Sequence, residues 1–512
     1  MIIETIKLSE MSVFTEFFLG ISIMYLIMYG LFVSFNSRNN FPLIQSSLIN
    51  LGVLTLLMSC FLMFNDSLNV FKSVSFCNTI VNDYLSFCAK MIIGVSSIVC
   101  LLLIKQYLIS QKINSFEYII ILLFSILGLF LLCSSNDFIT TYLAIELQSL
   151  SFYLLAAFKK NSSYSVESGL KYFILGSFAS GLFLFGSSLV YGALGTVNFT
   201  DFKNLLIFEE VTPIKTSIFS NPEMIFETEN FVTIGLLFVF ISLFFKLALA
   251  PFHLWSPDIY ENSPSSSAFF FAVVPKISIF VAIFRFSYYA LFDGLAWSQE
   301  VIAIISIASI IVGSLGGLEQ RKFKSLLAYS SISHMGYLLI TFASESIEGV
   351  QMLFCYLIIY IGSGLCIWSV FMLTRLKKVD EKKQNKDLAD FMQLKKSNVM
   401  LAIILMTALF SIAGLPPMIG FIVKINVFLI AIQKSMYFLA IFSMLFSVIS
   451  TFFYIRIVKI LFFEPVLVGK LYYPIISSKV SIVVLLFFLF LFLFVNPTML
   501  YLISHKMSLL FV

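Results

Sequence analysis

The chain has 512 residues, of which 60% are hydrophobic and only 12% are charged, and its mean hydropathy is +1.01. A soluble domain carries about twice that share of charged residues, so the composition excludes a soluble protein and indicates a chain embedded in lipid. The net charge of +5 says little by itself, because in membrane proteins the distribution of charge matters more than its sum.

Apolar runs of about 20 residues, each long enough to cross a bilayer as a helix, recur along the sequence. We predict an all-α polytopic membrane protein with about 14 transmembrane helices. The predicted spans are 13–34, 43–64, 86–106, 117–135, 137–158, 167–191, 231–262, 265–291, 299–317, 323–343, 347–374, 398–433, 435–462 and 480–504. Two of them, 231–262 and 398–433, are too long for one straight helix and are interrupted by proline or glycine.

The charges in the loops test this count. The loops after predicted spans 1, 3, 5, 9, 11 and 13 are basic, whereas those after spans 2, 4, 6, 8 and 10 are acidic or nearly neutral. By the positive-inside rule, this alternation places both termini on the outer side and the hydrophilic 375–396 stretch on the inner side. The loop after span 7 departs from the pattern with Asp258 and Glu261. The 375–396 stretch suits an amphipathic surface helix, a docking site or a solvated linker.

Ionisable residues deep within a span are costly and often mark an ion path. Glu146 lies near the middle of span 137–158, and Lys171 lies near one end of the next span. We expect a Glu146–Lys171 pair between neighbouring helices. The alternatives are a protonated Glu146 and a Lys171 that extends to the membrane surface, as we expect of Lys90.

The first interrupted span combines a buried lysine with a proline. Lys246 precedes Pro251, whose ring lacks an N–H group and therefore frees the carbonyl of Leu247. Free carbonyls at a helix break attract cations and water, and a buried lysine beside them can load and release a proton. His253 lies seven residues after Lys246, two helical turns along the same face, and is either a proton relay or a satisfied structural histidine.

The second interrupted span has the same features in reverse order. Pro416 and Pro417 free the carbonyls of Ile412 and Ala413, and Lys424 follows them. A lysine before the proline in one span and after it in the other is what an inverted repeat produces.

The repeat hypothesis divides the chain into four parts. We predict a three-helix segment at 1–110, inverted five-helix repeats at 117–291 and 299–462, and a C-terminal helix at 480–504. Two further buried groups lie in the repeats. Lys276 follows a proline in span 265–291, and His334 lies in a serine-rich stretch, where it either bonds to the serine hydroxyls or serves the ion path.

Several classes of cofactor site are missing from the sequence. The seven cysteines are scattered without a CxxC pair, which argues against Fe–S ligation and a disulfide framework. There is no nucleotide-binding loop, Rossmann fingerprint or paired-histidine haem pattern. We therefore expect the chain to bind no cofactor or metal and to draw energy from an ion gradient or a partner.

Five motifs resemble a known family. In order between about residues 115 and 435, they are ELQSLSFYLLAAF, SGLKYFILGSFASG, KLALAPFHLWSPDIYENSP, LLAYSSISHMGY and AGLPPMIGFIVK. They are similar to the antiporter-like membrane subunits of the proton-pumping NADH:ubiquinone oxidoreductase, respiratory complex I, and in particular to its subunit 2 family.

The resemblance implies a core membrane-arm subunit that translocates protons. Electron transfer from NADH to ubiquinone would take place in other subunits, which hold FMN and Fe–S clusters. The roles it implies are a coupling pair of Glu146 and Lys171, a central proton site at Lys246, a bridge of Lys276 and His334, and an exit-side site at Lys424. The rival functions are a subunit of a multisubunit cation/proton antiporter and a structural subunit that pumps nothing.

The implied partners are other membrane-arm subunits. They comprise the small four-L-type subunit, the neighbouring antiporter-like subunit four and lineage-specific accessory subunits, with lipids including cardiolipin and no nucleic acid. The phenylalanine-rich composition and the lack of a targeting segment favour the mitochondrial inner membrane, with both termini on the intermembrane-space side. A bacterial plasma membrane is the alternative.

Overall fold

The computed structural model describes residues 13–34, 42–67, 72–111, 113, 115–202, 222–290, 296–374, 376–377, 387–392, 394–464, 471–472 and 477–508. Over these residues the chain is helical apart from two short two-stranded sheets. The elements up to the middle of the chain are α1 (Phe14–Ser34), α2 (Pro42–Ser67), β1 (Lys72–Ser75), β2 (Ile80–Asp83), α3 (Tyr84–Ser110), α4 (Glu117–Ser134), α5 (Phe138–Ala157), α6 (Ser163–Leu194), α8 (Pro222–Leu247), α9 (Trp255–Asn262), α10 (Ser265–Val273) and α11 (Pro275–Ala290).

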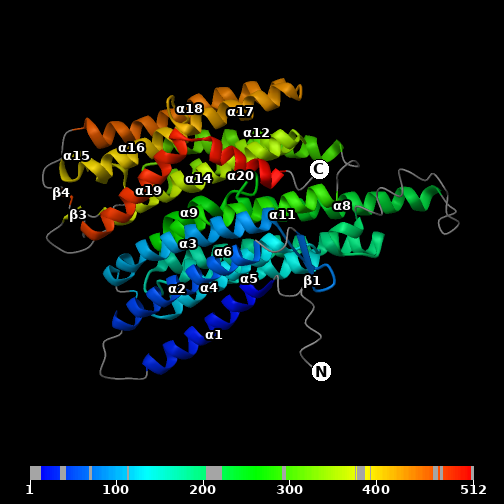
Figure 1. The fold of residues 1–512 in the computed structure, drawn as a ribbon. Coiled ribbons are helices and arrows are strands. Elements are labelled where there is room, and N and C mark those ends of the chain that lie inside the picture. The colour runs from blue at the N-terminus through cyan, green and yellow to red at the C-terminus, as the bar shows by residue number, and fades with distance from the viewer. Residues whose placement is uncertain are drawn as a thin grey trace.

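The second half continues the bundle. Its elements are α12 (Ala296–Glu319), α13 (Phe323–Ala343), α14 (Ile347–Leu373), β3 (Leu376–Lys377), η3 (Leu388–Phe391), α15 (Leu394–Ser397), α16 (Val399–Ala413), α17 (Ile419–Gln433), α18 (Tyr437–Phe462), β4 (Leu471–Tyr472), α19 (Ser477–Val495) and α20 (Thr498–Ser508). Figure 1 shows these helices running side by side, with hairpin β1–β2 at one end of the bundle and β3, β4 and α15 at the other.

Many helices are long and apolar enough to cross a membrane. Within the described residues eleven helices meet this condition, or twelve if the bent pair α19–α20 is one span. The two interrupted predicted spans appear instead as shorter helices on either side of a break, α8 with α9 and α16 with α17. The prediction of an all-helical polytopic membrane protein is therefore confirmed.

Two predicted spans differ in detail from the structure. Span 265–291 is interrupted between α10 and α11, because Pro275 cannot donate a backbone hydrogen bond. The C-terminal span 480–504 was expected to be one helix, but α19 and α20 meet at 77°. The bend lies at Asn496 and Pro497, and the proline again removes a helical donor.

One end of the bundle gathers the loops that follow predicted spans 2, 4 and 6. The side-chain amide of Asn136 donates to the backbone oxygen of Asn78 at 3.0 Å and to Oδ1 of Asn198 at 3.2 Å. Isolated bridges pair Ile80 with Ser135 and Asp137 with Asn198. The loops after these even-numbered spans therefore lie at the same end of the bundle, as the alternating loop charges require.

The other end gathers the basic loops. Lys322 forms an ion pair with Glu261, and the Lys324 amine donates to the backbone oxygen of Ser263 at 2.8 Å. The acidic loop after predicted span 7 thus lies beside the basic loop after span 9. This pairing gives the physical reason for the one departure from the charge pattern, because the basic neighbour neutralises the glutamate.

The hydrophilic 375–396 stretch is described only in part. Residues 387–392 contain the short helix η3, in which Leu388 and Phe391 are buried, and the Phe391 ring lies 4.8 Å from that of Phe323. Over these residues the stretch is therefore packed onto the bundle rather than forming a long amphipathic helix. Residues 378–386 lie outside the described residues.

Two buried ion pairs hold the N-terminal helices in place, one within residues 1–110 and one between that segment and α11. Lys90 forms an ion pair with Glu16, and both side chains are almost fully buried. The expectation that Lys90 extends to the surface is therefore wrong, because a carboxylate from α1 compensates its charge inside the bundle. Arg285 on α11 is fully buried and contacts Asp83 at 2.5 Å.

We expect the Asp83–Arg285 pair to be essential for attaching the N-terminal segment. Arg285→Met leaves the Asp83 charge buried without its partner, a loss that typically destabilises a protein by about 3–5 kcal/mol. Thermal unfolding of the detergent-solubilised full chain should show this loss. Adding Asp83→Leu should restore most of the stability, while Lys160→Met at an exposed site should change little. Equal melting of the single variant and the unchanged chain would contradict the assignment.

Candidate functional site

The first helix break exposes the carbonyl that the sequence predicted. Helix α8 ends at Leu247, and α9 begins at Trp255. The Leu247 carbonyl accepts a hydrogen bond at 3.1 Å from the amine of Lys276, which comes from α11. The Trp255 indole N–H donates to the Phe245 carbonyl at 2.9 Å. The freed Leu247 carbonyl is thus bound by a side chain from beyond the break, and the Trp255 bond adds a second link across it.

Lys246 lies beside this break but does not bind its carbonyls. Its amine is buried and, among the described residues, has no hydrogen-bond partner. It lies 5.9 Å from the centre of the Tyr153 ring. Lys246 and Lys276 line one cavity of about 10 Å³ together with Gln148 and Ser149. An unpaired buried ammonium is costly, which makes Lys246 a candidate functional residue.

Glu146 is the acidic residue whose charge acts on Lys246. Its side chain is half-buried on α5, and the two groups interact electrostatically. Oε1 of Glu146 is buried, with no hydrogen-bond partner in the described part of the chain. The carboxylate is therefore free to respond to the charge of Lys246.

The predicted Glu146–Lys171 pair is wrong. The Lys171 side chain is 45% exposed and pairs with Glu167 at 2.9 Å and with Asp258 at 3.2 Å. Position 171 lies on the outward face of α6, where Glu167 one turn earlier is its neighbour. The rotation of α6 about its axis, which loop and span lengths do not fix, decided the partner.

His253 also differs from the expectation. It lies in the turn between α8 and α9, so it does not continue a helical face from Lys246. The ring is half-buried, and its Nδ1 atom has no hydrogen-bond partner among the described groups. The helical spacing failed here because the break that Pro251 causes comes before His253.

The second break repeats the arrangement of the first. Helix α16 ends at Ala413, followed by Gly414 with a φ of 77°, in the left-handed region that glycine tolerates. The amine of Lys424, on α17, donates to the Ala413 carbonyl at 2.9 Å. In both breaks a lysine amine therefore binds the carbonyl four residues before a proline, Pro251 in the first and Pro417 in the second.

His334 lies between two tyrosines. Its Nδ1 atom is 2.7 Å from the Tyr356 hydroxyl, and its Nε2 atom is 3.0 Å from the Tyr454 hydroxyl. Of the two alternatives for His334, bonds to the serine hydroxyls are absent from this fully described helix, because Ser330, Ser331 and Ser333 donate to carbonyls of α13 itself. Both ring nitrogens are thus engaged by groups that can pass a proton.

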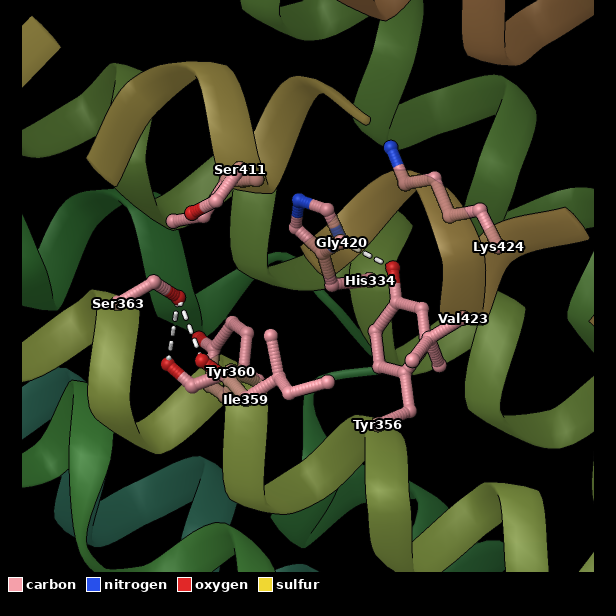
Figure 2. A pocket seen from close by; sticks show the side chains of 10 residues that line it. His334, Tyr356, Ile359, Tyr360, Ser363, Ser411, Gly420, Val423 and Lys424 are labelled. Atoms are coloured by element: carbon pink, nitrogen blue, oxygen red, sulfur yellow. Dashed lines mark hydrogen bonds between the residues drawn. The ribbon is translucent and has the colours of Figure 1, made fainter. Parts of the chain in front are cut away.

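A cavity of about 20 Å³ joins His334 to Lys424. Figure 2 shows its lining, with Tyr356 and Tyr360 from α14 on one side and Lys424 from α17 on another. A cavity of this size has room for about one water molecule. The structure therefore brings Lys424 and His334 to one polar pocket.

Sequence reasoning missed several of these groups. Tyr356 and Tyr360 on α14 and Tyr454 on α18 lie in apolar spans. The spacing of Tyr356 and Tyr360 was a visible signal, since residues four apart share a helix face. Arg285 in span 265–291 was equally visible as a charge in an apolar run.

Comparison with known proteins identifies the family. The sequence model described as NADH:quinone oxidoreductase/Mrp antiporter, TM, matches residues 135–450. The chain belongs to this family. A curated relative in the family is the NADH-ubiquinone oxidoreductase chain 2 of Marchantia polymorpha, 36% identical over 499 residues and covering 98% of each chain. The NADH-quinone oxidoreductase subunit N of Pelagibacter ubique is 36% identical over 450 residues, 88% of each chain.

Solved structures of the family share the fold. A chain of respiratory complex I from Thermus thermophilus matches with a TM-score of 0.76 at 24% identity, covering 95% of this chain and 98% of that one. A chain of the Mrp complex from Dietzia sp. matches with a TM-score of 0.79 at 16% identity, covering 97% and 96%. The antiporter-like fold is therefore common to complex I and to an antiporter complex.

The second break depends on a close approach at Gly420. A Cβ atom at this position would overlap the Ser411 carbonyl oxygen, so Gly420→Ala should push α17 away from α16 and displace Lys424. We expect a loss of about 1–3 kcal/mol in thermal stability of the solubilised protein, typical of overpacking. Gly192→Ala is the matched control, because its Cβ would meet nothing within 4 Å. Similar melting of both variants would contradict this packing.

Proposed function

We propose that this chain is a proton-translocating core subunit of the membrane arm of respiratory complex I. The observation that carries the proposal is the pair of broken helices, each with a freed carbonyl bound by a buried lysine. Family membership and the two relatives of the complex I type support the same conclusion. The chain contributes to NADH:ubiquinone reductase activity, while FMN, Fe–S clusters, NADH and ubiquinone are bound by other subunits.

The proton path follows the buried cations. Glu146 would set the charge state of Lys246, and the proton would then pass Lys276 and His334 to Lys424 and leave on the outer side. The Lys246–Lys276 cavity and the His334–Lys424 cavity support the two ends of this path. Lys171 faces outward and would act through a neighbouring chain rather than on Lys246 directly.

The energies required are within reach of such a path. Moving one charge across about 150 mV costs roughly 3.5 kcal/mol. A tenfold change in a proton-binding constant corresponds to about 1.4 kcal/mol. Changes of two to three powers of ten, roughly, in the proton affinity of Lys246 would therefore suffice, and an approaching or departing carboxylate is a suitable cause.

We infer fourteen crossings in two inverted repeats as the complete architecture. The eleven long helices would be joined by three interrupted crossings, α8 with α9, α16 with α17, and α19 with α20. A lysine–carbonyl bond at each break supports two repeats at residues 117–291 and 299–462, although Lys276 of the first bond comes from α11 of the following predicted span and Lys424 of the second from α17 of the broken pair itself.

The lateral surface supports a position between other subunits. Lys171, Glu167 and Asp258 form an exposed charged cluster on a helix face whose neighbours Leu170 and Ile174 are 58% and 63% exposed. Charged groups at such a site are costly in lipid, so a protein neighbour would cover them. The four-L-type subunit, the antiporter-like subunit four and accessory subunits are the proposed neighbours, with cardiolipin among the lipids. The relative from Marchantia polymorpha supports a mitochondrial inner membrane. The alternating loop charges are the basis for proposing both termini in the intermembrane space.

Replacement of the buried lysines tests this function. In the assembled complex, Lys246→Met and Lys424→Met should each lower NADH:ubiquinone turnover and proton translocation severalfold, because electron transfer is coupled to the blocked path. Lys434→Met, at an exposed lysine near the end of α17, is the matched control and should have little effect. Turnover should be normalised to the amount of assembled complex.

Two outcomes would reject the proposal. Unchanged turnover with unchanged protons per electron in both variants would make the chain a structural subunit. Purification of the chain in an antiporter complex without flavin and Fe–S subunits would favour the cation/proton antiporter that the Dietzia fold match also allows.

A further inference from the structure

A third helix break lies between the two lysine sites. Pro275 begins α11 and lacks an N–H group, which frees the Phe271 carbonyl four residues earlier. The Tyr260 hydroxyl donates to this carbonyl at 3.3 Å. The next carbonyl, that of Ala272, accepts a hydrogen bond from the Tyr360 hydroxyl, also at 3.3 Å. Two tyrosines thus bind the break one turn before Lys276.

The two tyrosines differ in what else they reach. Tyr360, on α14, lines the cavity that contains His334 and Lys424, and its ring centre lies 5.9 Å from that of His334. Tyr260, on α9, does not line this cavity. In Figure 2 Tyr360 lies beside Ser363, on the lining of the same pocket as the His334–Tyr356 hydrogen bond. Tyr360 is therefore the group that touches both the break beside Lys276 and the pocket of Lys424.

We propose that Tyr360 is a proton relay between the Lys276 and His334 segments of the path. This inference rests on the proposed proton pump. Its hydroxyl is both a donor and an acceptor, so it can take a proton on its oxygen while releasing its own. The hydroxyl first turns from the Ala272 carbonyl toward His334, takes a proton on its oxygen from the side of the Lys276 ammonium, and releases its own proton toward His334. The proton it has gained then lies on the Ala272 side, which restores the starting arrangement. Tyr360 is neutral before and after each transfer.

The surroundings of Tyr360 support a relay. The cavity has room for about one water molecule, and Tyr360 and His334 both line it. His334 in turn contacts two further hydroxyls, those of Tyr356 and Tyr454. The carbonyl of Ala272 can hold the hydroxyl but cannot keep a proton, so the bound state does not trap the transferred charge.

A comparison of Tyr360→Phe with Tyr260→Phe tests the inference in the assembled complex. Each variant removes one hydroxyl from one neighbouring carbonyl at the same distance, so the structural losses are matched. We expect Tyr360→Phe to lower NADH:ubiquinone turnover severalfold per assembled complex and to change its solvent deuterium isotope effect. Tyr260→Phe should stay close to the unchanged complex in both measurements.

Measuring Lys246→Met in parallel distinguishes failure of the Tyr360 relay from failure of the proposed proton pump. If Lys246→Met blocks turnover while Tyr360→Phe behaves like Tyr260→Phe, the relay is rejected and the pump stands. If Lys246→Met leaves turnover unchanged, the proposed function itself fails. If Tyr360→Phe lowers the amount of assembled complex, the protons translocated per electron are measured in the complex that remains. An unchanged ratio, together with the same turnover per complex as in the unchanged protein, rejects the relay.

Discussion

The structure depends on one constraint, the need of backbone carbonyls inside a membrane for hydrogen-bond donors. A helix satisfies its own carbonyls, and a proline within it leaves one without a donor. This chain breaks its helices at prolines and supplies donors from elsewhere. Lysine amines bind the carbonyls of Leu247 and Ala413, and tyrosine hydroxyls bind the carbonyls of Phe271 and Ala272. The same bonds that stabilise the breaks place amine and hydroxyl groups deep in the bundle.

A carbonyl is a suitable partner for such a lysine. It fixes the position of the amine but adds no opposite charge that would hold the ammonium permanently protonated. A carboxylate does the reverse, and the buried pairs Glu16–Lys90 and Asp83–Arg285 illustrate it. The Glu16–Lys90 pair joins α1 to α3, and the Asp83–Arg285 pair joins the N-terminal segment to α11. The amines bound to carbonyls, and Lys246, which has no hydrogen-bond partner among the described residues, have no carboxylate in contact with them.

Much of the fold followed from the sequence. The positions of most helices, the two interrupted spans and the identity of the freed carbonyls of Leu247 and Ala413 were all predicted. The loop charges also grouped the loops correctly at the two ends, and the exception at Glu261 proved to be its ion pair with Lys322. These predictions succeeded because each depends on the length of an apolar run, the charge of a loop or the missing N–H group of a proline.

The contacts between helices were harder to predict from the sequence. Glu146 and Lys171 lie on adjacent helices, yet the lysine faces outward to Glu167 and Asp258. His334 was expected among serines, but the hydroxyls of Tyr356 and Tyr454 reach it from α14 and α18. The sequence by itself determined that this protein crosses a membrane and where its helices break, since those properties are local. Only the tertiary structure decided which side chain meets which break, because that depends on how each helix is rotated and packed against neighbours far away in the chain.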